Sequence, residues 1–249
     1  MKKIYIHIGL HKTASSAIQK FMKDNEKEFL KKNIYIPQKA CEFNHLSNHC
    51  NLFFEKLKNY SFKDCQLKSL LNEIKSQKIV LLSSETFEFL INKREIFLQI
   101  LNEFRKLNYE IELICYTRND KFYLSSRYVE LLISKKYNED MLLPDFFTFF
   151  LLAFFKGSFE IKPLNWTCYF NNAYKKNLKN HNIKVNYLKY EDQKNNIISS
   201  FLKILNLNLN HFRVNNEIIN ASDKIKYKKF FSGVNYFLSC IIFYKRKYF

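Results

Sequence analysis

Short apolar runs alternate with longer amphipathic stretches along most of this chain. Three of the runs carry few polar residues before their last positions: KIYIHIG at 3–9, KIVLLSSE at 78–85 and EIELICYTR at 110–118. Strands that are apolar almost throughout are typical of a parallel sheet covered on both faces. Two shorter runs, NIYIP at 33–37 and KVNYLKYE at 184–191, complete the predicted strands.

The segments between these strands space their apolar residues as helices do. The predicted helical segments are 15–31, 64–77, 87–107, 120–136, 144–160, 166–180 and 195–207. Alternating strands and helices predict an α/β fold with a central parallel sheet of about four to five strands and helices on both faces. We expect one domain at 1–208, with a helical insertion, followed by a helical tail at 209–249.

Polar residues gather where three of the predicted strands end. HKTASS follows the first strand, SSE ends the strand at 78–85, and TRND begins at the end of the strand at 110–118. The carboxyl ends of parallel strands meet at one edge of a sheet, and ligands bind at that edge. The three strand ends therefore predict a single site.

Composition and charge limit the class of protein and of ligand. The chain has 249 residues, 47% of them hydrophobic and 26% charged, which indicates a globular protein with a sizeable core. Its net charge of +18 favours anionic partners such as nucleic acid, anionic lipid, a nucleotide or an acidic glycan. The six cysteines are scattered without a CxxC pair, so we expect reduced and mostly buried thiols.

The stretch HIGLHKTASSAIQ at 7–19 joins the first strand to the first helix. A helix N-terminus offers free backbone N–H groups and the positive end of the helix dipole, which together bind phosphate. Lys12 adds a positive charge, and Thr13, Ser15 and Ser16 add hydroxyl donors. The alternative is that Ser15 or Ser16 merely caps the helix. The stretch lacks the Walker A pattern GxxxxGK[ST], which disfavours a kinase or NTPase but leaves that class as an alternative.

This stretch resembles the 5′-phosphosulfate-binding loop of sulfotransferases, whose bacterial branch carries H-x-G-x-x-K-T-[GA]-[ST]-[ST]-x-x-Q near the N-terminus. The matching residues are His7, Gly9, Lys12, Thr13, Ala14, Ser15, Ser16 and Gln19. Ala14 stands where the family usually has glycine, although alanine does not adopt a positive φ cheaply. The resemblance implies a P-loop-like fold and the donor 3′-phosphoadenosine 5′-phosphosulfate, bound through Gly9 and residues 12–16.

The same donor carries a 3′-phosphate, which the family holds with an arginine at the end of a central strand and a serine on the following helix. The matching residues here are Arg118 and Ser126. Arginine suits this task because its planar fork binds two phosphate oxygens at once. The stretch 185–207 also resembles the family's late strand, its Y-E-D corner and the helix behind it. The resemblance thus covers roughly residues 1–208.

The resemblance also implies how sulfuryl transfer is divided among these residues. Lys12 is expected to donate to the leaving phosphate oxygen, and no metal is expected because lysine, backbone amides and the helix dipole supply the positive field. A hydroxyl acceptor needs a general base. Glu85 is the first candidate because it ends an apolar strand at the same edge, and His11 and His45 are the second. The alternative for Glu85 is a carboxylate that caps the next helix.

A small cluster of possible metal ligands precedes the second half of the chain. Cys41, His45, His49 and Cys50 form the pattern C-x3-H-x3-H-C, in which two histidines can lie one helical turn apart. The spacing fits no standard zinc finger. We therefore favour acceptor binding by His45 and His49, or a structural role, over a metal site.

Two further stretches are unusually apolar. FFTFFLLAFF at 146–155 is expected to form a buried or partner-packed helix. VNYFLSCIIFY at 234–244 is flanked by KYKK and KRK, and it fits either an interfacial segment on an anionic membrane or a helix docked on the core. Neither reaches the roughly 18 to 20 apolar residues that span a bilayer.

The location and the partners follow from these features as expectations. MKKIYIHIGL at the start has too short an apolar run for a signal peptide, so we expect a cytoplasmic protein, with peripheral membrane contact through its tail. A glycan or glycolipid is the expected acceptor. Nucleic acid is not an expected partner because the positive charge is dispersed over the chain and no known module is present, although a basic nucleic-acid-binding protein stays an alternative.

Overall fold

A computed structural model describes residues 2–10, 13–41, 47–49, 65–85, 87–88, 94–119, 123, 178, 181 and 183–214. The chain divides into two compact units, Met1–Arg118 with Tyr169–Ile219, and Asn119–Cys168 with Asn220–Phe249. The described helices and strands belong to the first unit: β1 (Lys2–Gly9), α1 (Ser15–Asp24), α2 (Glu26–Lys31), β2 (Ile34–Tyr35), α4 (Cys65–Ile74), β3 (Ile79–Ser83), α5 (Arg94–Lys106), β4 (Tyr109–Thr117), β5 (Lys184–Lys189), α9 (Tyr190–Gln193), α10 (Ile197–Ile204) and the short 3-10 helix η3 (Leu209–His211).

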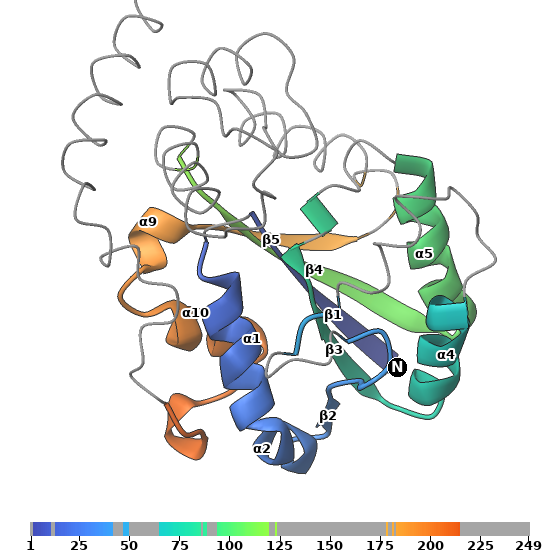
Figure 1. Ribbon diagram of the computed structural model, residues 1–249, viewed down its shortest axis with the longest axis horizontal. Helices are drawn as coiled ribbons and strands as arrows, with labels where there is room; N and C mark the ends of the chain where they lie inside the picture. The colour runs from blue at the N-terminus through green and yellow to red at the C-terminus, as the bar shows by residue number, and fades with distance from the viewer. Residues whose placement is uncertain are drawn as a thin grey trace, which may run out of the picture. The chain divides into compact units, whose positions relative to one another are not determined.

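The first unit is built on five parallel strands in the order β2-β3-β1-β4-β5 (Figure 1). The central strand is β1, in which His7 lies opposite Ser83 of β3 and opposite Ile114 of β4. The three inner strands are buried along most of their length. That burial explains why their sequences are apolar almost throughout. The predicted α/β fold with a parallel sheet of four to five strands is confirmed.

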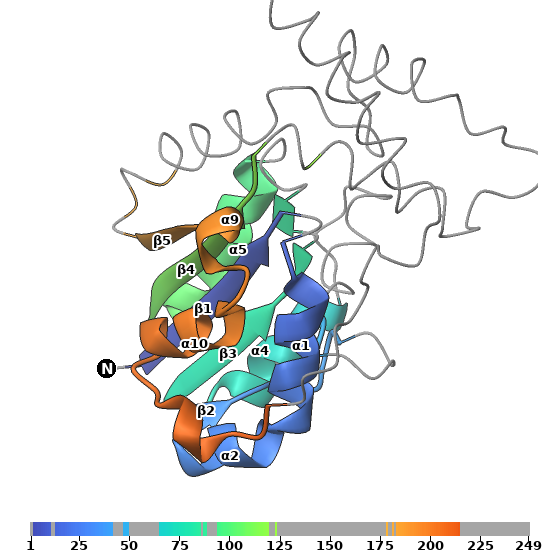
Figure 2. The same cartoon turned by 90° about the vertical axis from the view of Figure 1, so that its left-hand side faces the viewer.

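Helices cover both faces of this sheet. Figures 1 and 2 show α4 and α5 on one face and α1 and α10 on the other. Every second residue of a strand points to the same face, so each strand contributes to the packing under both helix layers. The core beneath α1 and α10 includes, among others, Tyr5, Ile18, Met22, Leu81, Ile114, Tyr116, Phe201 and Leu202.

The first predicted helix, 15–31, is two helices, so the prediction of one continuous helix was wrong. Asn25 separates α1 from α2 and is buried. Its Nδ2 donates to Phe21 O (3.0 Å) and to Arg213 O (2.9 Å), while its Oδ1 accepts from Arg213 N (2.8 Å). The break therefore depends on a partner far away in the sequence, which the local apolar pattern does not encode.

The first unit runs to Ile219, past the predicted start of the tail at residue 209. Phe212 is 9% exposed, and its ring centre lies 5.6 Å from that of Phe21 and 4.9 Å from that of Phe29. The stretches 146–155 and 234–244 lie outside the described residues. Among the residues that are described, no helix is long and apolar enough to cross a membrane.

A buried carboxylate links three strands of the sheet. Glu112 of β4 is 1% exposed and forms ion pairs with Lys3 Nζ of β1 (2.6 Å) and Lys184 Nζ of β5 (2.9 Å). It also accepts a hydrogen bond from Asn186 Nδ2 of β5 (2.7 Å). Burial alone would raise the pKa of Glu112, but these hydrogen bonds outweigh burial and hold the pKa below its ordinary value. The carboxylate is therefore ionised and paired at neutral pH.

Candidate functional site

The carboxyl ends of β1, β3 and β4 lie side by side, as the polar strand ends predict. Two backbone hydrogen bonds tie the segments that follow them to the neighbouring strands. Leu10 N donates to Tyr116 O (3.1 Å), and Ser84 N donates to His7 O (3.1 Å). The turn after β1 therefore starts between the ends of its two neighbours, which is where open parallel sheets bind ligands.

Thr13 closes the turn between β1 and α1. Its Oγ1 donates to Leu10 O (2.6 Å), and its backbone N donates to the same oxygen (3.2 Å). The side chain is fully buried. The resemblance implies that Thr13 binds the donor phosphate, but both of its hydrogen-bond donors are used within the turn. Its described contacts are therefore structural.

Gly9 allows this turn to fold closely over the end of β1. A Cβ atom at Gly9 would lie 2.3 Å from Ser15 Oγ and 2.8 Å from Thr13 Oγ1, closer than nonbonded atoms approach. His7 Nε2 would lie 3.5 Å from the same point. A side chain is therefore excluded at Gly9 by the packing of the turn.

Ala14 is the N-cap residue of α1 and adopts the left-handed conformation, with φ 63° and ψ 24°. Its own side chain makes no capping hydrogen bond, and the first turn of α1, which lies within the described residues, contains no acidic residue. Ser15 is the first helical residue, and its Oγ is buried with no hydrogen-bond partner among the described residues. The alternative that Ser15 or Ser16 merely caps the helix is therefore wrong. The N-terminus of α1 keeps a positive end that favours an anion.

Arg118 follows the last residue of β4, and 18% of its side chain is exposed. Its Cζ lies 5.0 Å from the centre of the Tyr190 ring, and its Nε lies 3.9 Å from Glu191 Oε1. Both partners begin α9 at the end of β5. Burial lowers the pKa of Arg118, and Tyr190 and Glu191 oppose that shift, so the guanidinium stays charged. The two partners hold a cation at the carboxyl edge of the sheet.

Glu85 lies just past the end of β3, at the same edge as the turn after β1. Its side chain is partly buried, and residues 85, 87 and 88 form a 3-10 turn rather than the start of an α-helix. Among the described residues, no α-helix begins directly after Glu85 that its carboxylate could cap. Glu88 of the same turn is fully buried. No signal in the sequence distinguished Glu88 from other acidic residues, so it was not a candidate site residue.

His49 is fully buried, with both ring nitrogens on backbone groups. Ser83 N donates to Nδ1 (3.2 Å), so the ring proton is on Nε2 and is donated to Pro37 O (3.1 Å). Burial lowers the pKa of His49 to about 4, although these backbone hydrogen bonds act in the opposite direction. The contacts are structural, and acceptor binding by His49 stays a prediction.

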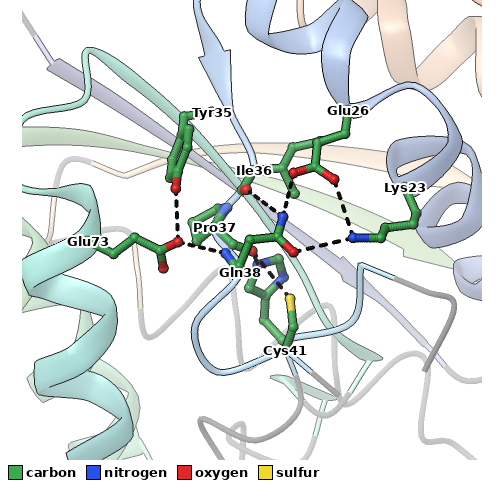
Figure 3. A network of polar contacts seen from close by, with 9 residues as sticks. Lys23, Glu26, Tyr35, Ile36, Pro37, Gln38, Cys41 and Glu73 are labelled. Atoms are coloured by element: carbon green, nitrogen blue, oxygen red, sulfur yellow. Dashed lines mark hydrogen bonds and ion pairs between the residues drawn. The ribbon is translucent and has the colours of Figure 1, made fainter. Parts of the chain in front are cut away.

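The segment 36–41, to which His49 is bonded, is fixed in turn by α4. Glu73 accepts from Tyr35 Oη and Gln38 N, each at 2.9 Å (Figure 3), and from Lys39 N at 2.9 Å. A carboxylate that accepts two backbone N–H groups and a phenol leaves little freedom to the segment. The segment 36–41 is therefore held in a fixed position next to β3.

Some predicted site residues lie outside the described residues, so their roles stay predictions: His11, Lys12, His45, Cys50 and Ser126. Cys41 is described, and its thiol donates to Pro37 O (3.3 Å). Burial raises the pKa of this thiol to about 12, which disfavours the thiolate that a metal ligand must be. In the part of the chain that the structure describes, no group of three or more His, Cys, Asp or Glu residues can hold a metal ion.

Sequence reasoning assigned no role of its own to His7, which the structure places beneath the turn. The ring is fully buried, and Nδ1 lies 2.7 Å from Ser83 Oγ. Gln19 is also buried, with its Nε2 lacking a partner among the described residues. Both residues belong to the motif quoted for the family resemblance, and a histidine within an apolar strand was the available signal.

Comparison with solved structures identifies the fold. A sulfotransferase from Alicyclobacillus acidocaldarius aligns with a TM-score of 0.52 and 13% sequence identity, over 94% of this chain and 92% of that chain. A mouse sulfotransferase complexed with PAP aligns with a TM-score of 0.36 and 13% identity, over 94% of this chain and 66% of that chain, and this score is too low to support an argument. No protein-family model matches the chain, and no curated protein sequence does. The chain has the sulfotransferase fold, as the resemblance implied.

Proposed function

We propose that this protein transfers the sulfuryl group of 3′-phosphoadenosine 5′-phosphosulfate to a hydroxyl group of a carbohydrate or glycolipid. One observation carries the proposal. The turn between β1 and α1 ends in a helix without a side-chain cap, and the Ser15 hydroxyl beside it is buried without a partner among the described residues. An unpaired buried hydroxyl costs about 1–3 kcal/mol, which an anionic oxygen bonded to it would recover.

The residues of this turn fit the 5′-phosphate of such a donor. Ser15 supplies a hydroxyl, and the first turn of α1 supplies the positive end of the helix dipole. Lys12 belongs to the same turn by sequence and adds a full positive charge. We assign to Lys12 a hydrogen bond to the bridging oxygen on which negative charge develops during transfer. The donor, when bound, supplies an activated sulfuryl group on a phosphate leaving group.

Arg118 is the proposed ligand of the 3′-phosphate, together with Ser126. Its position at the carboxyl end of β4, next to β1, supports this assignment. Tyr190 and Glu191 restrict the guanidinium, so less side-chain entropy is lost when it binds an anion.

Glu85 is the proposed general base. Its carboxylate follows β3, the other neighbour of β1, and a base at that edge accepts the hydroxyl proton of the acceptor as the new O–S bond forms. His11 and His45 are the second choices for this role.

The proposed setting follows from the charge and the tail. A net charge of +18 supports an anionic donor, and a basic aromatic tail supports an acceptor near an anionic membrane surface. We therefore propose a cytoplasmic enzyme with peripheral membrane contact, a glycan or glycolipid acceptor, and no nucleic-acid partner.

Calorimetry with 3′-phosphoadenosine 5′-phosphate tests the donor site. We expect Lys12→Ala and Arg118→Ala to weaken binding by about tenfold or more, because each removes a charge-assisted hydrogen bond. Lys27→Ala removes the same charge from an exposed position on α2 and is the matched control, which should bind like the unchanged protein. Binding of ATP but not of this nucleotide would favour a kinase. Salt-dependent DNA binding without nucleotide affinity would favour a nucleic-acid-binding protein.

Transfer of radiolabelled sulfate to glycans and glycolipids of the host tests the chemistry and identifies the acceptor. Glu85→Ala should bind the nucleotide normally and lose turnover, because only the proton acceptor is removed. If turnover survives in Glu85→Ala, another residue is the base, and His11→Ala and His45→Ala are then the variants to compare.

A further inference from the structure

His7 is a fully buried polar group in β1, the central strand of the sheet. Its ring packs edge-on against Tyr116 (ring centres 5.6 Å apart) and Phe201 (5.7 Å). Desolvation lowers the pKa of His7 to about 3, so the ring is neutral at physiological pH. A neutral imidazole carries one proton, on either Nδ1 or Nε2, and its neighbours decide which.

The hydrogen-bond count of the pair His7–Ser83 identifies the position of that proton. Nδ1 lies 2.7 Å from Ser83 Oγ, and both residues are fully buried. If Nδ1 carried the proton, the Ser83 hydroxyl proton would need another acceptor, and Nε2 would be an unpaired acceptor as well. If Ser83 donates to Nδ1, its hydroxyl proton is paired and Nε2 carries the ring proton. The second arrangement leaves fewer buried groups unpaired, so it is favoured.

His7 Nε2 and Ser15 Oγ are both buried and lack a hydrogen-bond partner among the described residues. They lie 3.5 Å and 2.3 Å from one point, the position of a Cβ on Gly9. Their separation cannot exceed the sum of these distances, which equals two ordinary hydrogen bonds of about 2.9 Å. No direct hydrogen bond joins them in the described structure, and a small shift of the Ser15 side chain toward His7, or one bridging water, would complete the connection.

We propose that His7 is a positioning residue of the donor site, whose Nε2–H group donates to Ser15 Oγ and thereby directs the Ser15 hydroxyl proton to a phosphate oxygen. The inference rests on the proposed function. The protons then point in one direction, from Ser83 through His7 and Ser15 to the phosphate, and His7 and Ser15 each donate one hydrogen bond and accept one. His49 fixes the backbone of Ser83, because His49 N donates to the Ser83 carbonyl oxygen (2.8 Å) and His49 Nδ1 accepts from Ser83 N (3.2 Å).

Two-bond 1H–15N correlation spectra of the labelled, unmodified protein test the tautomer directly. We expect a protonated Nε2 and an unprotonated Nδ1 for His7, whose signals are assigned by their loss in His7→Gln. A protonated Nδ1 would overturn the inference. This measurement does not depend on nucleotide binding.

A double-mutant cycle tests the role in binding. His7→Asn has no donor at the Nε2 position and should weaken binding of 3′-phosphoadenosine 5′-phosphate about three- to tenfold, as loss of one hydrogen bond implies. His7→Gln places an amide nitrogen near that position and should recover most of the lost affinity. In a Ser15→Ala background, His7→Asn should cause no further loss, because its effect passes through Ser15.

The outcomes separate this inference from the proposed function. Equal loss from His7→Asn with and without Ser15 would overturn the inference while the donor site stands. If the unmodified protein does not bind the nucleotide, the proposed donor is refuted and the inference is refuted with it, whatever the tautomer.

Discussion

The left-handed conformation of Ala14 leads to a prediction with an unusual sign. Five described residues other than glycine have positive φ, and three of them are asparagines, which tolerate this conformation. The other two are Ala14 (φ 63°) and Ala40 (φ 62°). We predict that Ala14→Gly stabilises the protein. Glycine usually destabilises a helix, but at a positive φ it removes the strain that alanine carries.

The size of the effect follows from two opposing terms. An L-residue in the left-handed conformation costs about 1–2 kcal/mol, and glycine removes that cost. Glycine also gives the unfolded chain more freedom, which costs about 0.4–1 kcal/mol. The net gain is about 0.5–1 kcal/mol, which corresponds to a rise of about 1–4 °C in melting temperature for a protein of this size.

Urea unfolding and thermal melting of three variants measure the prediction. Ala40→Gly should gain a similar amount at a second left-handed alanine, in the segment after β2. Ala17→Gly lies inside α1 and should lose about 1 kcal/mol, because glycine is a poor helix former. If Ala14→Gly lost as much as Ala17→Gly, residue 14 would be helical and the described turn would be incorrect.

Three further predictions concern buried groups. Gly9→Ala should cost about 1–3 kcal/mol in urea unfolding and weaken nucleotide binding, because the added Cβ would lie 2.3 Å from Ser15 Oγ; an unchanged protein would contradict the packing of the turn. His7 and His49 have pKa values lowered to about 3 and about 4, so below pH 6.5 the unfolded chain binds protons that the folded protein does not. Stability should therefore fall by about 2 kcal/mol for each histidine between pH 7.5 and pH 5, measured by urea unfolding at several pH values, and a flat profile would show that the rings are not buried as described. The lowered pKa of Glu112 means that its stabilising effect is present above the unfolded value and lost as the pH falls through the folded value. Glu112→Gln should therefore cost about 1–3 kcal/mol at pH 7 and progressively less as the pH falls through the folded pKa; a cost that does not change with pH would assign the effect to packing.

Much of the sheet could be predicted because its signal is local. The runs at 3–9, 78–85 and 110–118 are apolar since each strand is buried on both faces, and that requirement acts on every residue of the strand. The polar ends of these strands also indicated one edge of the sheet, which the strand order confirms. The break at Asn25 could not be predicted, because it depends on hydrogen bonds to Arg213.

The candidate site shows the same division between local and distant causes. The composition of the turn at 7–19 was visible as a motif, since its residues are neighbours in the chain. The pairing of Arg118 with Tyr190 and Glu191 was not visible, because β5 comes to lie beside β4 only after a long connection. The burial of His49 likewise depends on Pro37 and Ser83, so its residue type alone suggested a ligand.

The sequence by itself determined the α/β class, the strands, and a turn whose residues suit an anion. The tertiary structure decided that Ala14 rather than a serine is the N-cap residue of α1 and that Thr13 is used within the turn. It leaves the Ser15 hydroxyl without a partner among the described residues. It also placed His7 beneath Ser15, across a glycine that has no room for a side chain. The physical reason is that periodicity and motifs record what each residue needs locally, whereas hydrogen-bond pairing depends on which distant groups the folded sheet brings within about 3 Å.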